Sequence, residues 1–140
     1  MTQAYLQQIE SSLASFIWVK SVQILRCDVL ETDEEEFLVY RFRVSLSGGS
    51  LLEMMERVIT TKKDGKTATT TYRFHLQDHT GNLKKRWDNA PHFSGLNGFP
   101  HHIHMGKEDH VVPSKPINGL EILNEIDRDF FDIDEKGKQK

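Results

Sequence analysis

Histidines are concentrated in one short stretch of the chain, "NGFPHHIHMG" at residues 97–106. His101, His102 and His104 fill three of four consecutive positions there, although the whole chain has only 7 histidines. Imidazole titrates near physiological pH, which suits it to proton transfer and to metal binding. In an extended segment, alternate side chains point to the same side. We therefore expect His102 and His104 to share one site and His101 to face away from it.

A metal at this site needs a third protein ligand, usually a carboxylate or another histidine. Asp88, His92 and His110 are close enough in sequence to supply one. No spacing in this region matches a zinc motif such as HExxH. The pattern thus favours a site without a metal. A divalent cation at His102, His104 and Asp88 is one alternative, and a turn whose imidazoles only bond the backbone is another.

Several segments that must position these histidines alternate between apolar and polar residues, as half-buried strands do. The clearest are "EFLVYRFRVSL" (36–46), "TATTTYRFHLQ" (67–77) and "LKKRWD" (83–88). Their apolar side carries Tyr40, Phe42, Tyr72, Phe74 and Trp87. Their polar side carries Arg41, Arg43, Arg73, His75, Arg86 and Asp88. A sheet face rich in arginine is a candidate site, unless the arginines pair with acids on neighbouring strands.

Further strands and two helices complete the predicted elements. The spacing of Leu6, Ile9, Leu13 and Phe16 predicts a helix over 3–17, and a similar stripe predicts a second helix over 116–130, with Pro116 in its first turn. The segment 51–61 is ambiguous because its apolar residues also fit a helical stripe, but its β-branched end and the flanking hairpins favour a strand. Asp64-Gly65 is a strong hairpin signal, and "HHIHMG" is read as a short strand.

These elements predict an α+β fold with two layers. We expect a largely antiparallel β-meander sheet, with the N- and C-terminal helices packed on its apolar face. Residues 1–132 are predicted to form a single domain, which fits a chain of 140 residues. The polar residues 133–140 are predicted to be a disordered tail.

Composition restricts the setting in which the protein works. A hydrophobic content of 37% and a charged content of 28% are typical of a soluble globular domain. No apolar run approaches the roughly 20 residues that cross a bilayer, and the N-terminus does not resemble a signal peptide. Cys27 is the only cysteine, which excludes an internal disulfide and a cysteine-rich zinc site. These features predict a cytoplasmic protein with no membrane partner.

Charge is distributed unevenly along the chain. The stretch 28–36 carries six acidic residues and no basic one, around "TDEEE", which we expect to be an exposed turn. Residues 62–107 carry eight lysines and arginines against three aspartates. Such asymmetry is compatible with an anionic partner for the second half of the chain.

The combination "RWDNAPHF…FPHHIHMG" is more specific than any of its parts. It resembles the TumE family of small prokaryotic toxin–antitoxin toxins, long treated as a domain of unknown function. The resemblance runs from about Tyr40 to the final helix and is densest over residues 72–93 and 99–106. The positions that match the family pattern are Tyr72, Arg73, Gly81, Arg86, Asp88, Asn89, His92, Phe99, Pro100, His101, His102 and His104.

The resemblance implies a growth-inhibiting toxin that is neutralised by an antitoxin protein encoded by an adjacent gene. Such antitoxins often carry a DNA-binding helix-turn-helix. The exposed acidic run 31–36 and the C-terminal tail are candidate contacts for this partner.

For the activity itself, the residue types suggest a metal-independent ribonuclease. RNA cleavage needs a base, an acid and cations around the phosphate. We predict His102, His104, Arg86 and Asp88 as catalytic residues. Substrate contacts are predicted for Arg73, Tyr72, Arg41, Arg43, His92 and His101. A non-catalytic module that binds nucleic acid or protein is the alternative, and a metal-dependent hydrolase using the histidine cluster is a further one.

Overall fold

The computed structural model describes residues 2–131 and contains two α-helices, one short 3₁₀ helix and seven strands. In chain order the elements are α1 (Thr2–Ser15), β1 (Val19–Glu31), β2 (Glu35–Leu46), η1 (Ser47–Gly49), β3 (Leu51–Thr61), β4 (Thr67–Gln77), β5 (Leu83–Asp88), β6 (His102–Met105), β7 (Val111–Pro113) and α2 (Gly119–Phe130). The predicted tail at 133–140 lies outside the described residues.

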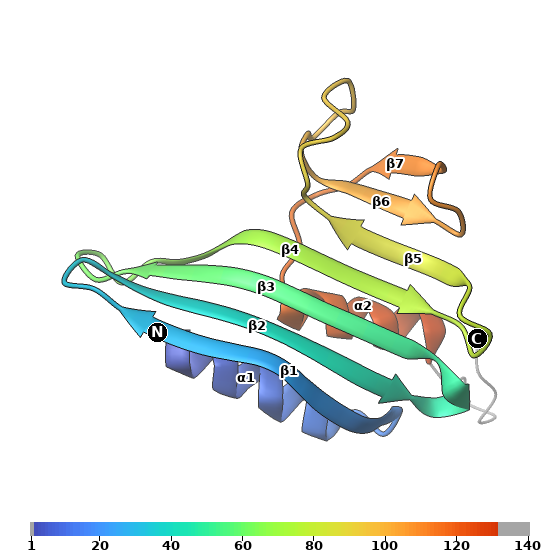
Figure 1. The fold of residues 1–140 in the computed structure, drawn as a ribbon, viewed down its shortest axis with the longest axis horizontal. Coiled ribbons are helices and arrows are strands. Elements are labelled where there is room, and N and C mark those ends of the chain that lie inside the picture. The colour runs from blue at the N-terminus through green and yellow to red at the C-terminus, as the bar shows by residue number, and fades with distance from the viewer. Residues whose placement is uncertain (1, 132–140) are drawn as a thin grey trace.

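The strands form one antiparallel sheet in which each strand pairs with the next one in sequence. The order is β1-β2-β3-β4-β5-β6-β7, which is a simple meander (Figure 1). Tight turns make this order possible: Gly65 has a φ of 69° in the predicted Asp64-Gly65 hairpin between β3 and β4. The ambiguous segment at 51–61 is a strand, as expected.

Both helices cover the same face of the sheet, which confirms the predicted α+β arrangement (Figure 1). We call this the covered face, and we call the other side, which carries Arg41, Arg73 and Asp88, the open face. The core between the layers is made of apolar side chains from both helices and from the sheet. Its largest fully buried members include Trp87, Tyr40, Phe42 and Phe74. Fully burying one aliphatic or aromatic side chain contributes roughly 1.5–3 kcal/mol, so this layer supplies most of the stability.

A buried carboxylate connects the two helices to the sheet. Glu56 of β3 accepts hydrogen bonds from the hydroxyls of Tyr5 (2.8 Å), Tyr40 and Thr69 (2.7 Å), and from the backbone N–H of Gly119 (3.0 Å). Burial raises the pKa of Glu56, although these hydrogen bonds act in the opposite direction. The side chain therefore fixes the position of α1 and of the first residue of α2.

The last helix begins later than the sequence pattern suggested. Pro116 lies before the helix, and Asn118 is its N-cap. The Asn118 side chain accepts from the backbone N–H of Glu121 (2.9 Å), while the Glu121 carboxylate accepts from the backbone N–H of Asn118 (3.2 Å). This reciprocal capping box satisfies two N–H groups at the start of the helix, and so Asn118, not Pro116, sets the boundary.

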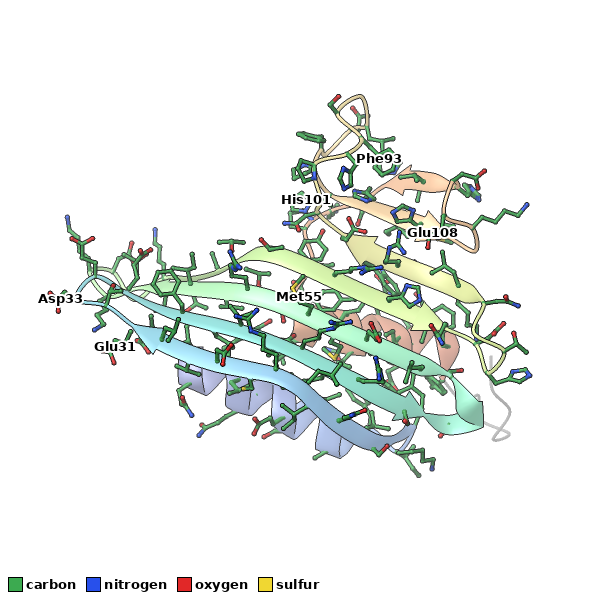
Figure 2. The ribbon with its side chains drawn as sticks, in the orientation of Figure 1. Glu31, Asp33, Met55, Phe93, His101 and Glu108 are labelled. Atoms are coloured by element: carbon green, nitrogen blue, oxygen red, sulfur yellow. The ribbon has the colours of Figure 1, made fainter. Side chains whose placement is uncertain are left out.

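The acidic run lies at the tip of the β1–β2 hairpin, far from the histidines. Figure 2 shows Glu31 and Asp33 at the tip of the β1–β2 hairpin, and Phe93, His101 and Glu108 around β6 and β7, at the opposite edge of the sheet. Glu31 forms an ion pair with Lys62 on the neighbouring β3–β4 turn. Among the described residues, no helix has the length and apolar character that a membrane span requires.

Candidate active site

The strand register brings most of the predicted site residues together in two adjacent rows on the open face. The first row crosses β2 to β6 through Arg41, Met55, Arg73, Asp88 and His102. The second row crosses the same strands through Arg43, Glu53, His75, Arg86 and His104. Side chains directly opposite each other on paired strands are within reach of one another. The two rows end at the histidines of β6.

The β6 histidines point to the open face because the residue between them is anchored on the covered face. Ile103 pairs with the buried Trp87 of β5 and packs against the core. Alternation along the strand then places His102 and His104 together on the open face. His101 precedes the strand and points elsewhere, as the sequence predicted.

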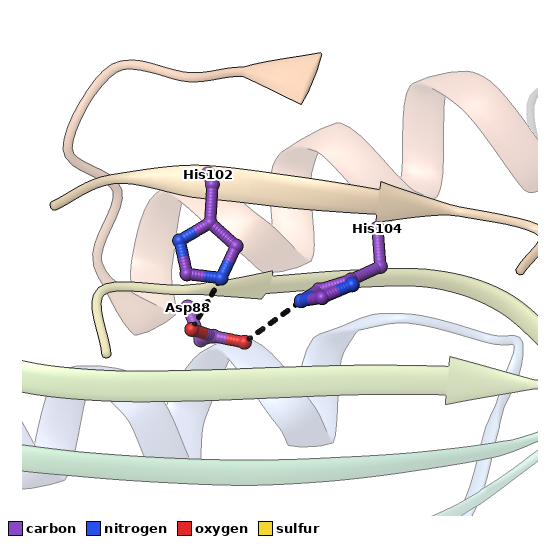
Figure 3. A group of neighbouring side chains, drawn as sticks. All are labelled: Asp88, His102 and His104. Atoms are coloured by element: carbon purple, nitrogen blue, oxygen red, sulfur yellow. Dashed lines mark ion pairs between the residues drawn. The ribbon is translucent and has the colours of Figure 1, made fainter. Parts of the chain in front are cut away.

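Asp88 lies between the two imidazoles, and these three residues form what we call the His–Asp cluster (Figure 3). His102 Nε2 is 2.8 Å from Asp88 Oδ1, and His104 Nε2 is 3.6 Å from Asp88 Oδ2. All three residues are buried, with exposed fractions of 6%, 1% and 5% for Asp88, His102 and His104. Buried polar groups in such proximity require compensating charge or hydrogen bonds.

The second ring nitrogen of each histidine is bonded to a backbone carbonyl. His102 Nδ1 lies 2.9 Å from the carbonyl oxygen of Pro100, and His104 Nδ1 lies 2.7 Å from that of Glu108. A carbonyl oxygen can only accept, so each Nδ1 carries the proton and donates it. Both Nε2 atoms are thereby directed at the Asp88 carboxylate.

Arg86 connects the cluster to a residue that the sequence analysis did not select. Its Nε donates to Asp88 Oδ2 (3.3 Å), and its two terminal nitrogens bind the Glu108 carboxylate in a bidentate pair. The Arg86 guanidinium is the main cause of the lowered pKa of Glu108. The feature of the sequence that could have pointed to Glu108 is its position four residues after His104, in the turn before β7.

The segment between β5 and β6 covers the cluster and forms one wall of a cavity. The Phe93 ring packs edge-on against both imidazoles, at centroid distances of 4.8 Å from His102 and 5.8 Å from His104. The cavity has a volume of about 740 Å³, and Asp88 and Arg73 also line it. Phe93 was not predicted as a site residue, although it lies in the "APHF" part of the motif.

The comparison with known protein families identifies the chain. The family model described as Toxin TumE matches residues 16–132, which includes the whole sheet, the cluster and α2. The chain belongs to the TumE toxin family. No curated protein and no solved structure gives a significant match.

Membership of the TumE family gives the coarse function. The chain is a toxin component of a toxin–antitoxin system, and the family implies a cognate antitoxin. The family match does not name a reaction.

The other arginines predicted as substrate contacts in this TumE-family chain differ in whether they form ion pairs. Glu53 forms ion pairs with Arg43 (3.0 Å) and Arg41 (3.5 Å), which is the pairing left open by the sequence analysis. Partial burial raises the pKa of Glu53, but the hydrogen bonds and charges of Arg43 and Arg41 together outweigh it, so the pKa is lowered. Arg73 is exposed, and within residues 2–131 no carboxylate lies within 4.0 Å of its guanidinium.

Three further predicted contacts lie outside the cluster. Tyr72 is buried and packs in the core of the covered face, and it is also among the residues that line the cavity. Its hydroxyl is 2.8 Å from His101 Nδ1, and the two rings stack with centroids 5.7 Å apart. Burial is the main cause of the raised pKa of Tyr72 and of the lowered pKa of His101. His92 is exposed and lines the cavity.

Proposed function

We propose that this toxin arrests growth by cleaving RNA in the cytoplasm, with the His–Asp cluster as its active site. The observation that supports the proposal is the convergence of two imidazoles and a carboxylate, all buried, at the wall of a cavity of about 740 Å³. Buried ionisable groups that share a cavity are typical of catalytic centres. The proposal extends the toxin role of the family to a specific reaction.

The reaction we propose is transesterification at a phosphodiester bond of RNA. The 2′-oxygen of the ribose forms a bond to phosphorus, and the bond between phosphorus and the 5′-oxygen breaks. One proton leaves the 2′-hydroxyl and one proton is delivered to the 5′-oxygen. The products are a 2′,3′-cyclic phosphate and a free 5′-hydroxyl, and no oxidant or external reactant is required.

The charges beside the cavity suit an anionic substrate. Arg73 lines the cavity next to Asp88 and is exposed. Because its guanidinium has no ion-pair partner within residues 2–131, it can bind a phosphate without first breaking an internal salt bridge. His92 offers an exposed imidazole at the same cavity, against which a base could stack. RNA is therefore the substrate class that the site favours.

Growth arrest and RNA integrity test this function together. The wild-type chain should stop growth on induction, and the RNA of those cells should show new 5′-hydroxyl ends. His102→Ala and Asp88→Asn should lose both effects. His79→Ala is the matched control, because His79 is an exposed histidine in the turn between β4 and β5.

Two outcomes would overturn the proposal. Growth arrest without new RNA ends would assign the toxicity to another target. Purified toxin that binds RNA at low salt but leaves it intact would support the non-catalytic binding module instead, since electrostatic binding weakens steeply with salt.

A further inference from the structure

We propose that the His–Asp cluster binds one divalent transition-metal ion through His102 Nε2, His104 Nε2 and the Asp88 carboxylate. The role of this ion as a cofactor of RNA cleavage rests on the proposed function. Its binding, however, can be measured without any assay of activity. The sequence alone favoured a site without a metal, and the geometry of the rings favours the alternative.

Each histidine presents one nitrogen to the Asp88 carboxylate. Both Nδ1–H groups are donated to backbone carbonyls. The remaining Nε2 atoms lie 2.8 Å (His102) and 3.6 Å (His104) from the Asp88 oxygens. A neutral imidazole in this tautomer directs a lone pair at a carboxylate, and two such contacts repel unless a cation lies between the atoms.

The separations between the three side chains suit a shared ion. Zinc binds nitrogen and carboxylate oxygen at about 2.0–2.2 Å, so two ligands of one tetrahedral or octahedral ion lie roughly 3.0–3.5 Å apart. The separations of 2.8 Å and 3.6 Å from Asp88 to the two imidazoles bracket this range. One ligand atom from each of the three residues lies within 4.8 Å of the others.

Surrounding groups hold each of the three ligands in place. Metal-binding histidines almost always donate their other ring N–H to a carbonyl or carboxylate, and both histidines do so here. The Asp88 carboxylate is oriented by the backbone N–H of Ala90 (3.1 Å) and by Arg86 Nε (3.3 Å). All three ligands are on paired strands, β5 and β6, which fix their relative positions.

The ion pairs around the His–Asp cluster leave a negative charge in excess. Arg86 carries one positive charge, while Asp88 and Glu108 together carry two negative charges, so this group has a net charge of −1 when both histidines are neutral. A dication reverses this excess without protonating either imidazole, and it satisfies both Nε2 lone pairs at once.

The donor set also defines the class of ion. Two imidazoles and one carboxylate favour zinc and its neighbours in the first transition row over Mg²⁺ and Ca²⁺, which prefer all-oxygen sites. Three protein ligands leave at least one coordination position for water or a phosphate oxygen, as in catalytic zinc sites. A metal-bound hydroxide would take the proton from the 2′-hydroxyl, and the water so formed would return one proton to the 5′-oxygen.

Metal titration of the full-length, untagged, chelator-treated protein tests the inference, with Zn²⁺ and Co²⁺ as probes. We expect one ion per chain, unaffected by millimolar Mg²⁺. His102→Ala, His104→Ala and Asp88→Ala should each weaken binding by more than about tenfold, since even the loss of a supporting contact has an effect of that order. His101→Ala and His79→Ala should bind as the wild type does.

The wild-type protein provides a test that does not depend on variants that fold. The Co²⁺ form should show two solvent-exchangeable, hyperfine-shifted protons in its NMR spectrum, one from each Nδ1–H opposite a metal-bound Nε2. Sub-stoichiometric binding, or the absence of these two signals, would overturn the inference.

The two proposals can fail separately. RNA cleavage that persists in excess chelator, but is lost in His102→Ala, would refute the metal site and support the ribonuclease activity. Stoichiometric binding of Zn²⁺ by a protein that leaves RNA intact would support the metal site and refute the ribonuclease activity.

Discussion

At the scale of single residues, the neighbours His101 and His102 have opposite surroundings. His102 is part of the cluster on the open face, whereas His101 stacks on Tyr72 and lies 2.8 Å from its hydroxyl. The alternation of an extended segment is enough to produce this difference. The two positions therefore separate a residue of the proposed active site from a residue that supports it.

Tyr72→Phe tests the supporting role. The change removes the hydrogen bond to His101 and keeps the buried ring, so we expect a loss of about 0.5–1.5 kcal/mol in the free energy of unfolding. Chemical unfolding measures this loss, and toxicity on induction should be unchanged. Loss of toxicity in a folded Tyr72→Phe protein would show that the hydroxyl contributes to the activity.

Arg73 and Arg43 form a second matched pair of residues. Arg73 has no ion-pair partner within the described residues, whereas Arg43 is bound to Glu53 at 3.0 Å. We expect Arg73→Ala to weaken RNA binding and to reduce the salt dependence of the binding constant by about one counterion. Arg43→Ala should change both much less. Equal effects of the two substitutions in a salt titration would contradict a specific role for Arg73.

At the scale of elements, Trp87 shows how one strand serves both faces of the sheet. Its side chain is 1% exposed on the covered face, while its neighbours Arg86 and Asp88 face the cluster. Trp87→Ala should lower the free energy of unfolding by about 3–5 kcal/mol, as expected for the loss of a large buried aromatic side chain. Urea unfolding gives the value. An unchanged midpoint would mean that β5 has the opposite orientation in solution.

Glu56 makes the docking of the helices sensitive to pH. Burial raises the pKa of this carboxyl in the folded protein, so folding favours its neutral form. The stabilising contribution is complete below the ordinary glutamate pKa of about 4.3, and it is lost as the pH rises through the raised value in the folded state. Glu56→Gln cannot ionise. The stability of the wild type relative to Glu56→Gln should therefore fall as the pH rises from about 4.

The measurement is urea unfolding of both proteins over a pH series. If the free energy of unfolding of the wild type relative to Glu56→Gln stays constant or grows with pH, the raised pKa of Glu56 is contradicted. Glu56→Ala serves as a second variant: it leaves the hydroxyls of Tyr40 and Thr69 without their acceptor, and each such loss costs about 1–3 kcal/mol.

At the scale of the whole molecule, the family match predicts a protein partner for this toxin. We expect the antitoxin to be encoded by an adjacent gene. Co-expression with that gene should restore growth, and the two proteins should elute together on size exclusion. Growth arrest that persists beside both neighbouring open reading frames would count against this arrangement. The acidic hairpin at 31–36 stays a candidate contact, and the tail lies outside the described residues.

The sequence by itself determined most of the elements and the identity of the chemical groups, although it did not predict the short strand β7. Alternation in β2, β4 and β5 reports on burial because side chains on a strand point to the two faces in turn, and so Trp87 and Phe74 could be assigned to the core. The TumE motif pointed to the family that the comparison then showed. The start of α2 was missed because it depends on the local bonds of Asn118, which the apolar period does not contain.

Only the tertiary structure decided how the site is arranged. The register of β5 against β6 places Asp88 opposite His102, and no periodicity in a single strand specifies the register between two strands. The carbonyls of Pro100 and Glu108 fix the tautomers of His102 and His104, and Glu53 and Glu108 determine which arginines are paired. These contacts join residues from different turns and strands, so they exist only once the chain has folded.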